Sequence, residues 1–313
     1  MPFALNTIAL EPYSVTESTI ILAATRQPKP MQPEGPGAVI GGMRLALLLL
    51  LSLSVGCSTA STNPVGAFRF RPERVPPVGT VLQYVKSNLD GSKPALVSLY
   101  FAGPQDIEVS KSEAGVPDST DVKAHLDYKR FTADRLDTGV LSPDGTREQR
   151  ATLSVNKDEL LARFGEVEQR LTANVFPLHL YNFDLMGLNV MLPHLRNPRK
   201  DFTIAFAEPT FGEDSGVIEL RGRATAAYVD DITVDGRNTH RYRLSGAGLA
   251  GAQAILCVDA ADGLIDLVES PLPTNPDWDS YRLSRLGKPQ LMSRLEWDAF
   301  KRAHVGIGVG VSR

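Results

Sequence analysis

The chain has 313 residues, with 33 lysines and arginines against 36 aspartates and glutamates, and a formal net charge of −3. Hydrophobic residues make up 42% of the chain and charged residues 22%, which excludes a wholly disordered chain and a polytopic membrane protein. The slight negative charge offers no basic surface for nucleic acid, and two cysteines exclude a disulfide scaffold and a four-cysteine zinc site.

Residues 1–42 carry four prolines between positions 28 and 36 and no sustained apolar periodicity. An apolar leader begins only after them, at Met43. We therefore interpret residues 1–42 as a non-structural extension, upstream of a physiological start at Met43.

Residues 43–56 have the pattern of a signal peptide. A cationic start, Met43-Arg44, precedes an apolar run of eleven residues from Leu45 to Val55. As a helix this run is about 16 Å long, about half of the roughly 30 Å of a bilayer core. A short cationic start, a brief apolar stretch and small residues at its end are typical of a secretory signal. A plain secreted signal and a buried core helix are the alternatives.

The end of this leader, Gly56-Cys57, resembles the lipobox of bacterial lipoproteins, with Ser54 where that motif usually has leucine. The resemblance implies cleavage between Gly56 and Cys57, acylation of Cys57, and anchoring in a membrane by the attached acyl chains. Ser58, which is not aspartate, implies an outer-membrane destination facing the periplasm. Residues 57–78, rich in Ser, Thr, Pro and Gly, are then expected to form an acylated tether.

From residue 79 to residue 300 the sequence alternates between β-rich runs and turn signals, which predicts a single antiparallel β-rich domain. Each of four Asp-Gly pairs can supply the positive φ angle of a tight turn. The predicted strands lie at 81–85, 95–101, 107–110, 151–155, 217–224, 239–244, 252–258, 264–269, 281–283 and 291–297, and the Asp-Gly turns at 90–91, 144–145, 235–236 and 262–263.

Residues 246–251 match the G-x-G-x-x-G pattern of dinucleotide-binding proteins. That motif needs a buried parallel strand before it and a helix after it, whereas here a half-polar strand precedes it and a β-rich run follows. We therefore interpret these glycines as a connection between two strands.

Two helices are expected to interrupt the strands. Asn156 is a candidate N-cap for the first, and apolar residues recur at near-helical spacing from Leu160 to Leu171. The second spans residues 178–192 and is apolar on nearly all sides, so it is buried or lies against lipid. It could be a core helix covering the sheet, a plug over a hydrophobic cavity, or an element that dips into a membrane. Its candidate cavity residues are Leu178, Tyr181, Phe183, Leu185, Met186, Leu188 and Met191.

The β-rich runs, the apolar helix and the Gly-rich hairpins, above all between Val217 and Trp297, resemble the LolA/LolB-like lipoprotein-carrier superfamily and its bacterial relatives. The resemblance implies an open β-barrel whose helices plug a cavity for acyl chains, without catalytic residues. The expected fold is mainly β (α+β): a curved antiparallel sheet or open half-barrel with one or two helices covering or plugging its concave side.

The sequence carries no motif of a nucleophile, a metal site or a cofactor site, so we predict a protein that is not an enzyme and that has no cofactor. Cys257 lies in an apolar run and is expected to pack as a small buried hydrophobe. Residues 301–313 are expected to form a tail or an edge strand.

The predicted function is that of a lipid-anchored envelope protein, placed in the bacterial cell envelope, that binds or handles a lipid or a lipoprotein acyl chain. Its expected partners are the membrane, the lipid ligand and an envelope protein complex, with no nucleic acid among them. The alternatives are a non-enzymatic scaffold lipoprotein with a solid core and an enzyme acting on an envelope glycan or lipid.

Overall fold

The computed structural model describes residues 64–211, 216–274 and 277–307. Residues 1–63, which include the expected leader, Gly56 and Cys57, lie outside this part of the chain, as do residues 308–313. The fold below is therefore that of the β-rich domain.

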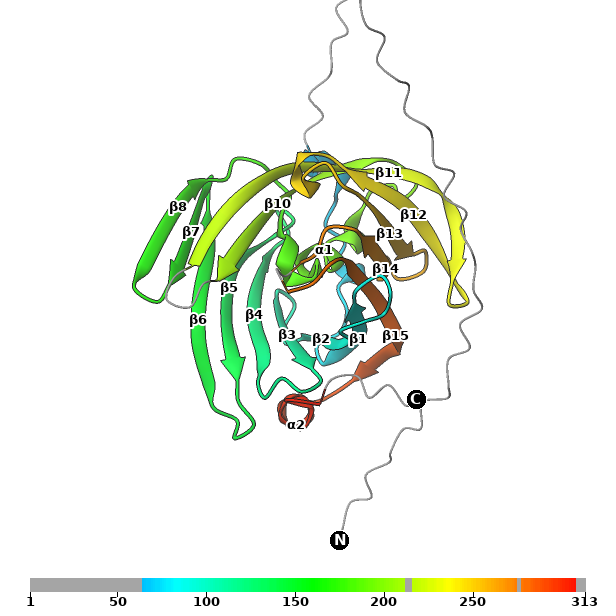
Figure 1. Cartoon of the computed structure of the whole chain (residues 1–313). Coiled ribbons are helices and arrows are strands. Elements are labelled where there is room, and N and C mark those ends of the chain that lie inside the picture. Colours follow the sequence, from blue (N-terminus) through cyan, green and yellow to red (C-terminus); the bar gives the residue numbers. More distant parts are fainter. Residues whose placement is uncertain (1–63, 212–215, 275–276, 308–313) are drawn as a thin grey trace, which may run out of the picture. The chain divides into compact units, whose positions relative to one another are not determined.

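The described residues form one sheet of 15 strands, curved around a central space (Figure 1). Its first eight strands are β1 (Thr80–Ser87), β2 (Ala95–Phe101), β3 (Asp106–Glu113), β4 (Ser119–Asp127), β5 (Thr132–Leu141), β6 (Arg147–Asn156), β7 (Glu159–Phe164) and β8 (Val167–Thr172). The others are β9 (Leu178–Leu180), β10 (Phe202–Phe211), β11 (Gly216–Val234), β12 (Arg237–Ser245), β13 (Gln253–Asp259), β14 (Ile265–Ser270) and β15 (Tyr281–Leu291).

The sheet consists of two meanders joined in its middle. Strands β1 to β8 follow one another to one edge, and strands β15 back to β9 follow one another to the other edge. The junction is the antiparallel pairing of β1 with β15, in which Thr80 lies opposite Leu291. Every pairing is antiparallel except that of β9 with β10. The two edge strands, β8 and β9, do not pair with each other, so the sheet stays open and the predicted fold class is confirmed.

Helices make up little of the described chain. They comprise α1 (Met186–Asn189) and α2 (Arg294–His304), with the 3-10 helices η1 (Pro64–Ala67), η2 (Pro72–Arg74), η3 (Tyr181–Phe183), η4 (Leu192–His194) and η5 (Ala247–Leu249). Within residues 64–211, 216–274 and 277–307, none has the length and apolar character needed to cross a bilayer.

All four Asp-Gly pairs lie between consecutive strands, as predicted, and the glycine of each has a positive φ angle. The glycines of residues 246–251 join β12 to β13, also as predicted. This connection packs tightly on β11, because a Cβ atom at Gly248 would lie 2.7 Å from the carbonyl oxygen of Gly222. The G-x-G-x-x-G pattern therefore reflects close packing of the backbone.

The helix predicted from Asn156 to Leu171 is wrong, because this stretch forms a hairpin. Asn156 ends β6 and pairs with Glu159 across a turn of two residues. Leu160, Ala162 and Phe164 are buried on one face of β7, at the period of two that marks a strand. A spacing of four residues between Leu160 and Phe164 fits a strand as well as a helix, which explains the error.

The apolar stretch from residue 178 to residue 195, which we call the inner segment, is not the continuous helix predicted for 178–192. It contains β9, η3, α1 and η4 in succession. Asp184 and Leu185 both have positive φ angles, 50° and 56°, and two such residues end any right-handed helix. The segment is nevertheless buried, and α1 lies in the space enclosed by the sheet (Figure 1).

The strand predicted from Leu291 to Trp297 is also wrong, because only its first residue belongs to a strand. β15 ends at Leu291, and Ser293 and Glu296 then form a capping box that begins α2. Residues 301–304, expected in a tail or edge strand, belong to this helix, and Ile307 makes a single β-bridge to Ala114.

The described part of the expected tether, residues 64–78, packs on the domain. Phe68 is buried, forms a β-bridge with Leu195 of the inner segment, and has its ring 5.1 Å from that of Phe131. Aromatic contacts of this kind stabilise a defined position of the chain. A flexible tether therefore cannot include Phe68 or the residues that follow it.

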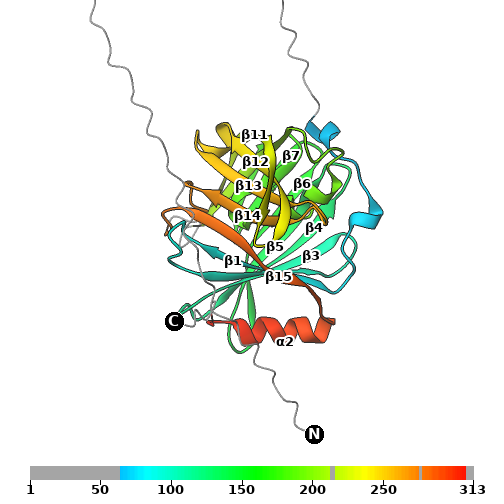
Figure 2. The same ribbon diagram turned by 90° about the vertical axis from the view of Figure 1, so that its right-hand side faces the viewer.

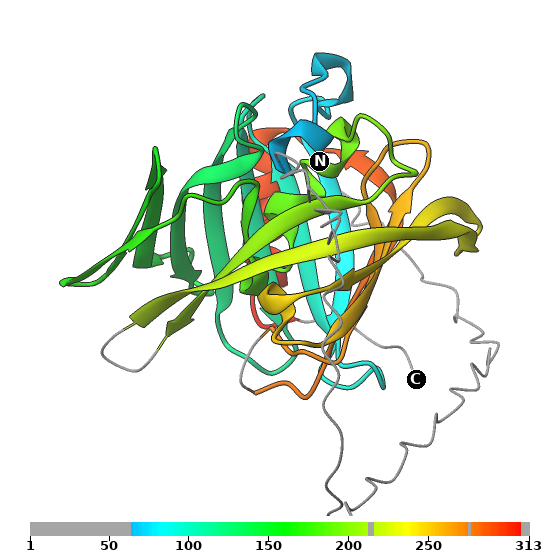
Figure 3. The ribbon, with the colours of Figure 1, turned by 90° about the horizontal axis from the view of Figure 1, so that it is seen from above.

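The two faces of the sheet are covered by different elements. The concave face packs on the inner segment and forms the main apolar core with it. The opposite face carries α2, which lies across the outside of the sheet in Figure 2. There Trp297 is fully buried and stacks on Tyr100 at 5.1 Å between ring centroids. The long strands β10 and β11 cross the molecule on the side seen in Figure 3.

Candidate functional site

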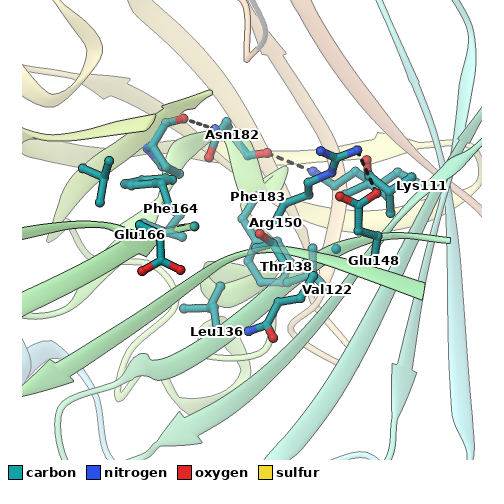
Figure 4. Close-up of a pocket in the computed structure, with 18 residues that line it drawn as sticks. Lys111, Val122, Leu136, Thr138, Glu148, Arg150, Phe164, Glu166, Asn182 and Phe183 are labelled. Carbon is teal, nitrogen blue, oxygen red and sulfur yellow. Dashed lines mark hydrogen bonds and ion pairs between the residues drawn. The ribbon is translucent and has the colours of Figure 1, made fainter. Parts of the chain in front are cut away.

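A cavity of about 780 Å³ lies on the concave side, where the sheet stays open. It is bounded by strands β3 to β8 on one side and by the inner segment and β10 on the other (Figure 4). Its position follows from the topology, because the sheet does not close here: β8 meets β11 through the side chain of Gln169, and β9 meets β5 through that of Thr132.

The walls of the cavity are largely apolar. On β5, Leu136, Thr138 and Val140 face it at the period of two expected of a strand. Further apolar residues come from β4, from the hairpin of β7 and β8, from the inner segment and from β10: Val122, Phe164, Val167, Leu180, Phe183 and Pro209. This lining can take a hydrophobic molecule.

Charged side chains of β6 and of the β7–β8 turn line another part of the wall. Arg150 pairs with Glu148 at 3.1 Å, and both side chains are more than half exposed. Glu166 is exposed in the turn that joins β7 to β8. Because these three side chains line the cavity and are exposed to solvent, they form a polar rim around the apolar walls.

A buried charge cluster, formed by Lys86, Lys111 and Asp184, adjoins the cavity. The carboxylate of Asp184 lies 2.7 Å from Nζ of Lys111 and 3.2 Å from Nζ of Lys86, and it is fully buried. Lys111 also lines the cavity and donates a hydrogen bond of 2.9 Å to the carbonyl oxygen of Asn182. The cluster thus fixes the turn at Asp184 that ends η3.

Burial and charge act in opposite directions on this cluster. Burial tends to raise the pKa of Asp184, but the ammonium groups of Lys111 and Lys86 outweigh it and hold the pKa below its usual value. Burial lowers the pKa of Lys111 by more than Asp184 raises it. An additional anion near Lys111 would therefore stabilise its protonated form.

The seam beside the cavity is bridged by one side chain. Gln169 of β8 donates a hydrogen bond of 2.9 Å to the carbonyl oxygen of Ile218 in β11 and accepts one of 2.8 Å from its amide. The side-chain amide thus makes the two bonds that a neighbouring strand would make. β7 and β11 approach closely at this seam, since a Cβ atom at Gly216 would lie 2.2 Å from the ring of Phe164.

The seven candidate cavity residues all lie in the inner segment, and they differ in position. Phe183 lines the cavity, and Leu178 borders a smaller hollow behind it that also contacts Phe183. The other five are buried in the core between the sheet and the inner segment: Tyr181, Leu185, Met186, Leu188 and Met191.

Sequence reasoning did not place the residues that the sheet contributes to the cavity, among them Lys111, Val122, Leu136, Thr138 and Phe164. The sequence pattern predicts a helix at Phe164 and predicts no strand at β4 or β5. The alternation of apolar and polar residues from 119 to 127 is the signal that could have placed Val122 on an inward face.

Other chemistry-bearing residues lie away from the cavity. Cys257 is fully buried, as predicted, and burial raises the pKa of its thiol to about 12. Within the described ranges, no group of three or more His, Cys, Asp or Glu side chains is arranged to hold a metal ion.

No family model matches the sequence, and no curated protein matches it. Among solved structures, the chain is similar to a β-barrel-like protein of the domain of unknown function DUF1849 from Brucella abortus, with 8% identity and a TM-score of 0.42 over 69% of this chain and 98% of that one. It is also similar to a putative outer membrane lipoprotein-sorting protein domain from Vibrio parahaemolyticus, with 11% identity and a TM-score of 0.22 over 75% and 94% of the two chains. A LolA superfamily protein from Nitrosomonas europaea is similar with 8% identity and a TM-score of 0.22, over 74% and 91%.

Proposed function

We propose that this chain is a lipid-anchored protein of the bacterial cell envelope that binds the acyl chain of a lipid or lipoprotein in the cavity on the concave side of its sheet. The observation that carries the proposal is the cavity of about 780 Å³ with largely apolar walls. Pockets for small ligands typically measure about 300–1,000 Å³ and combine apolar walls with a few polar groups.

The cavity favours a ligand-binding protein over the rival hypothesis of a scaffold with a solid core. The cavity is open to solvent at its rim, where Glu148, Arg150 and Glu166 are exposed. A recess of this size with apolar walls and a few polar groups is typical of a ligand pocket. A packed scaffold would have no use for such a space.

The enzyme hypothesis has less support. Two carboxylates line the cavity, but that of Glu148 is paired with Arg150 and that of Glu166 lies in an exposed turn. General acid–base catalysis needs carboxyl groups that the structure holds in place beside the substrate, and an exposed ion pair and an exposed turn do not hold them in this way. We therefore keep the prediction that the protein is not an enzyme.

The proposed envelope location rests on the sequence of the leader. Residues 43–56 have the features of a signal peptide and are followed directly by Cys57, the proposed site of acylation. Two or more acyl chains give stable membrane binding, since each buried methylene contributes about 0.8 kcal/mol. A cavity protein anchored in this way would meet its lipid ligand at the membrane surface.

Filling the cavity tests the proposal. The full chain is purified from bacterial envelopes, and non-covalently bound lipid is extracted with organic solvent and identified by mass spectrometry. The parent protein should release acyl lipid in near-stoichiometric amounts. Thr138→Trp places an indole ring in the cavity, and the protein with this substitution should release no acyl lipid.

The matched control is Arg135→Trp, because Arg135 is exposed on the same strand and does not line the cavity. It should retain the lipid. A parent protein that releases no lipid would overturn the proposal, as would equal lipid in the parent and in Thr138→Trp.

A further inference from the structure

The buried charge cluster indicates which part of a lipid the cavity recognises. Lys111 is the member of the cluster that lines the cavity, where its side chain lies beside Asn182 (Figure 4). Its ammonium lies 5.9 Å from the centre of the Phe183 ring, a residue of the apolar wall. A cation and an apolar wall are therefore adjacent in the same cavity.

The ammonium of Lys111 keeps one donor for a ligand. A lysine ammonium has three N–H groups, and the described residues give this one two oxygen acceptors, on Asp184 and Asn182. The side chain is 16% exposed, although its partner Asp184 is fully buried. A ligand in the cavity can thus reach the third donor.

Among the described residues, the two lysines of the cluster share one carboxylate as their ion-pair partner. Asp184 is the single carboxylate that pairs with both lysines, and Lys86 has its ammonium 4.4 Å from the centre of the Trp278 ring rather than near a second acid. Glu113, half-buried on the same strand, is a further acid that acts on Lys111, more weakly than Asp184 does. Two buried ammonium groups are thus only partly compensated, and because an unpaired buried charge is costly, an anion beside Lys111 would be stabilised.

We infer that the cavity selects amphiphiles with an anionic head group, which Lys111 binds, while the apolar tail lies along Val122, Leu136 and Phe164. This inference rests on the proposed function and names the class of its ligand. Carboxylate and phosphate share the chemistry that Lys111 recognises, because both accept a charge-assisted hydrogen bond from an ammonium.

The charges of the rim do not offer an equivalent site. Arg150 is paired with Glu148, and its side chain is 53% exposed, so water screens it. Glu166 repels an anion rather than binding it. Selectivity for a negative head group is therefore assigned to the cluster at Lys111 and not to the rim.

Calorimetric titration of the delipidated full chain with four ligands of equal chain length tests the inference: dodecanoate, dodecyl phosphate, dodecanol and dodecyltrimethylammonium. At least one of the two anions should bind about tenfold more tightly than dodecanol, the effect of one hydrogen bond to a charged group. The tighter anion identifies the head group as a carboxylate or as a phosphate.

Lys111→Met should remove this preference, so that neither anion binds more tightly than dodecanol does to the same variant. Circular dichroism and urea unfolding check that the variant is folded. Lys111→Arg, which keeps the charge, should retain the preference. Lys123→Met is the matched control, since Lys123 is exposed on the neighbouring strand β4.

The outcomes separate the inference from the proposed function. If none of the four ligands binds, the proposed function fails. If dodecanol or dodecyltrimethylammonium binds as tightly as the anions, or if Lys111→Met keeps the preference, the cavity still binds acyl chains and the inference alone is overturned.

Discussion

Asp266 shows how a single buried side chain can make stability depend on pH. It is fully buried on β14, where Arg237 lies 2.8 Å and Arg285 3.6 Å from its Oδ1 atom. Burial raises the pKa of Asp266 to about 6, more than these two arginines lower it. In sequence, Asp266 looks like the solvent-facing residue of an alternating strand, so its burial could not be predicted.

The sign of this effect follows from linkage. The folded state holds the proton of Asp266 up to about pH 6, whereas the unfolded chain releases it near pH 4. Between these values the folded state binds more protons, so the contribution of Asp266 to stability falls as pH rises.

We expect Asp266→Asn to remove this dependence. The difference in free energy of unfolding, variant minus parent, should increase by about 2–3 kcal/mol when the pH is raised from 4 to 7. Urea unfolding at several pH values measures it. A difference between the two proteins that stays constant over this range would contradict the assignment.

At the scale of elements, Gln169 closes the seam between β8 and β11 with one side chain in place of a row of strand hydrogen bonds. Gln169→Ala removes both bonds to Ile218 and should increase the hydrogen exchange rate of the Ile218 amide about tenfold. Thr172→Ala, an exposed position on the same strand, is the control and should leave that rate unchanged. Protection of Ile218 in both variants would mean that other contacts hold the seam.

The helix α2 depends on a buried ammonium. Nζ of Lys301 lies 3.1 Å from a carboxylate oxygen of Glu108 and 2.9 Å from one of Asp121, and the side chain is only 8% exposed. Arg147 and Arg294 provide these two acids with further partners. The charges attach the helix to the outer face of β3 and β4.

Lys301→Met leaves part of the negative charge of Glu108 and Asp121 buried without a partner. The variant should lose about 3 kcal/mol of stability. Arg302→Met, at the exposed neighbouring position, should lose less than about 0.5 kcal/mol. Thermal unfolding compares the two, and equal losses would contradict a structural role of Lys301.

Strands and turns could be predicted from the sequence where a local pattern is compatible with only one type of secondary structure. The Asp-Gly turns and the strands beside them are such cases. The spacing of Leu160 and Phe164 fits both a helix and a strand, so it does not decide between them. After Leu291 the sequence looks β-rich, but the capping box of Ser293 and Glu296 begins a helix there. The turn at Asp184 depends on lysines distant in sequence, so no local pattern reveals it.

For the whole molecule, the proposed anchor makes a prediction about location. Cys57→Ser should move the protein from the membrane fraction to the soluble fraction and abolish labelling by fatty acid. Cys257→Ala is the matched control, because its buried thiol is the chain's other cysteine and should not affect either result. Membrane association that persists in Cys57→Ser would contradict the proposed acylation.

The cavity itself could be predicted only in part. Phe183 was expected because the inner segment is so apolar, and the curved sheet was expected from its strands and turns. The opposing wall depends on which strands end at the open seam, and that order arises from the pairing of β1 with β15, some 200 residues apart in sequence. A pairing between strands so far apart in sequence cannot be inferred from the pattern of neighbouring residues.

The pairing of β1 with β15 also makes it possible to change the order in which the strands follow one another along the chain. Thr80 and Leu291 are neighbours, so in a version of the domain without residues 64–79 and α2 a short linker can join them, and new termini can be opened between β8 and β9. In this circular permutant every antiparallel pair becomes consecutive along the chain, from β9 through β15 and β1 to β8. Fewer distant contacts should make it fold faster in stopped-flow refolding, whereas in the native order the central pair forms only after the last strand has been synthesised.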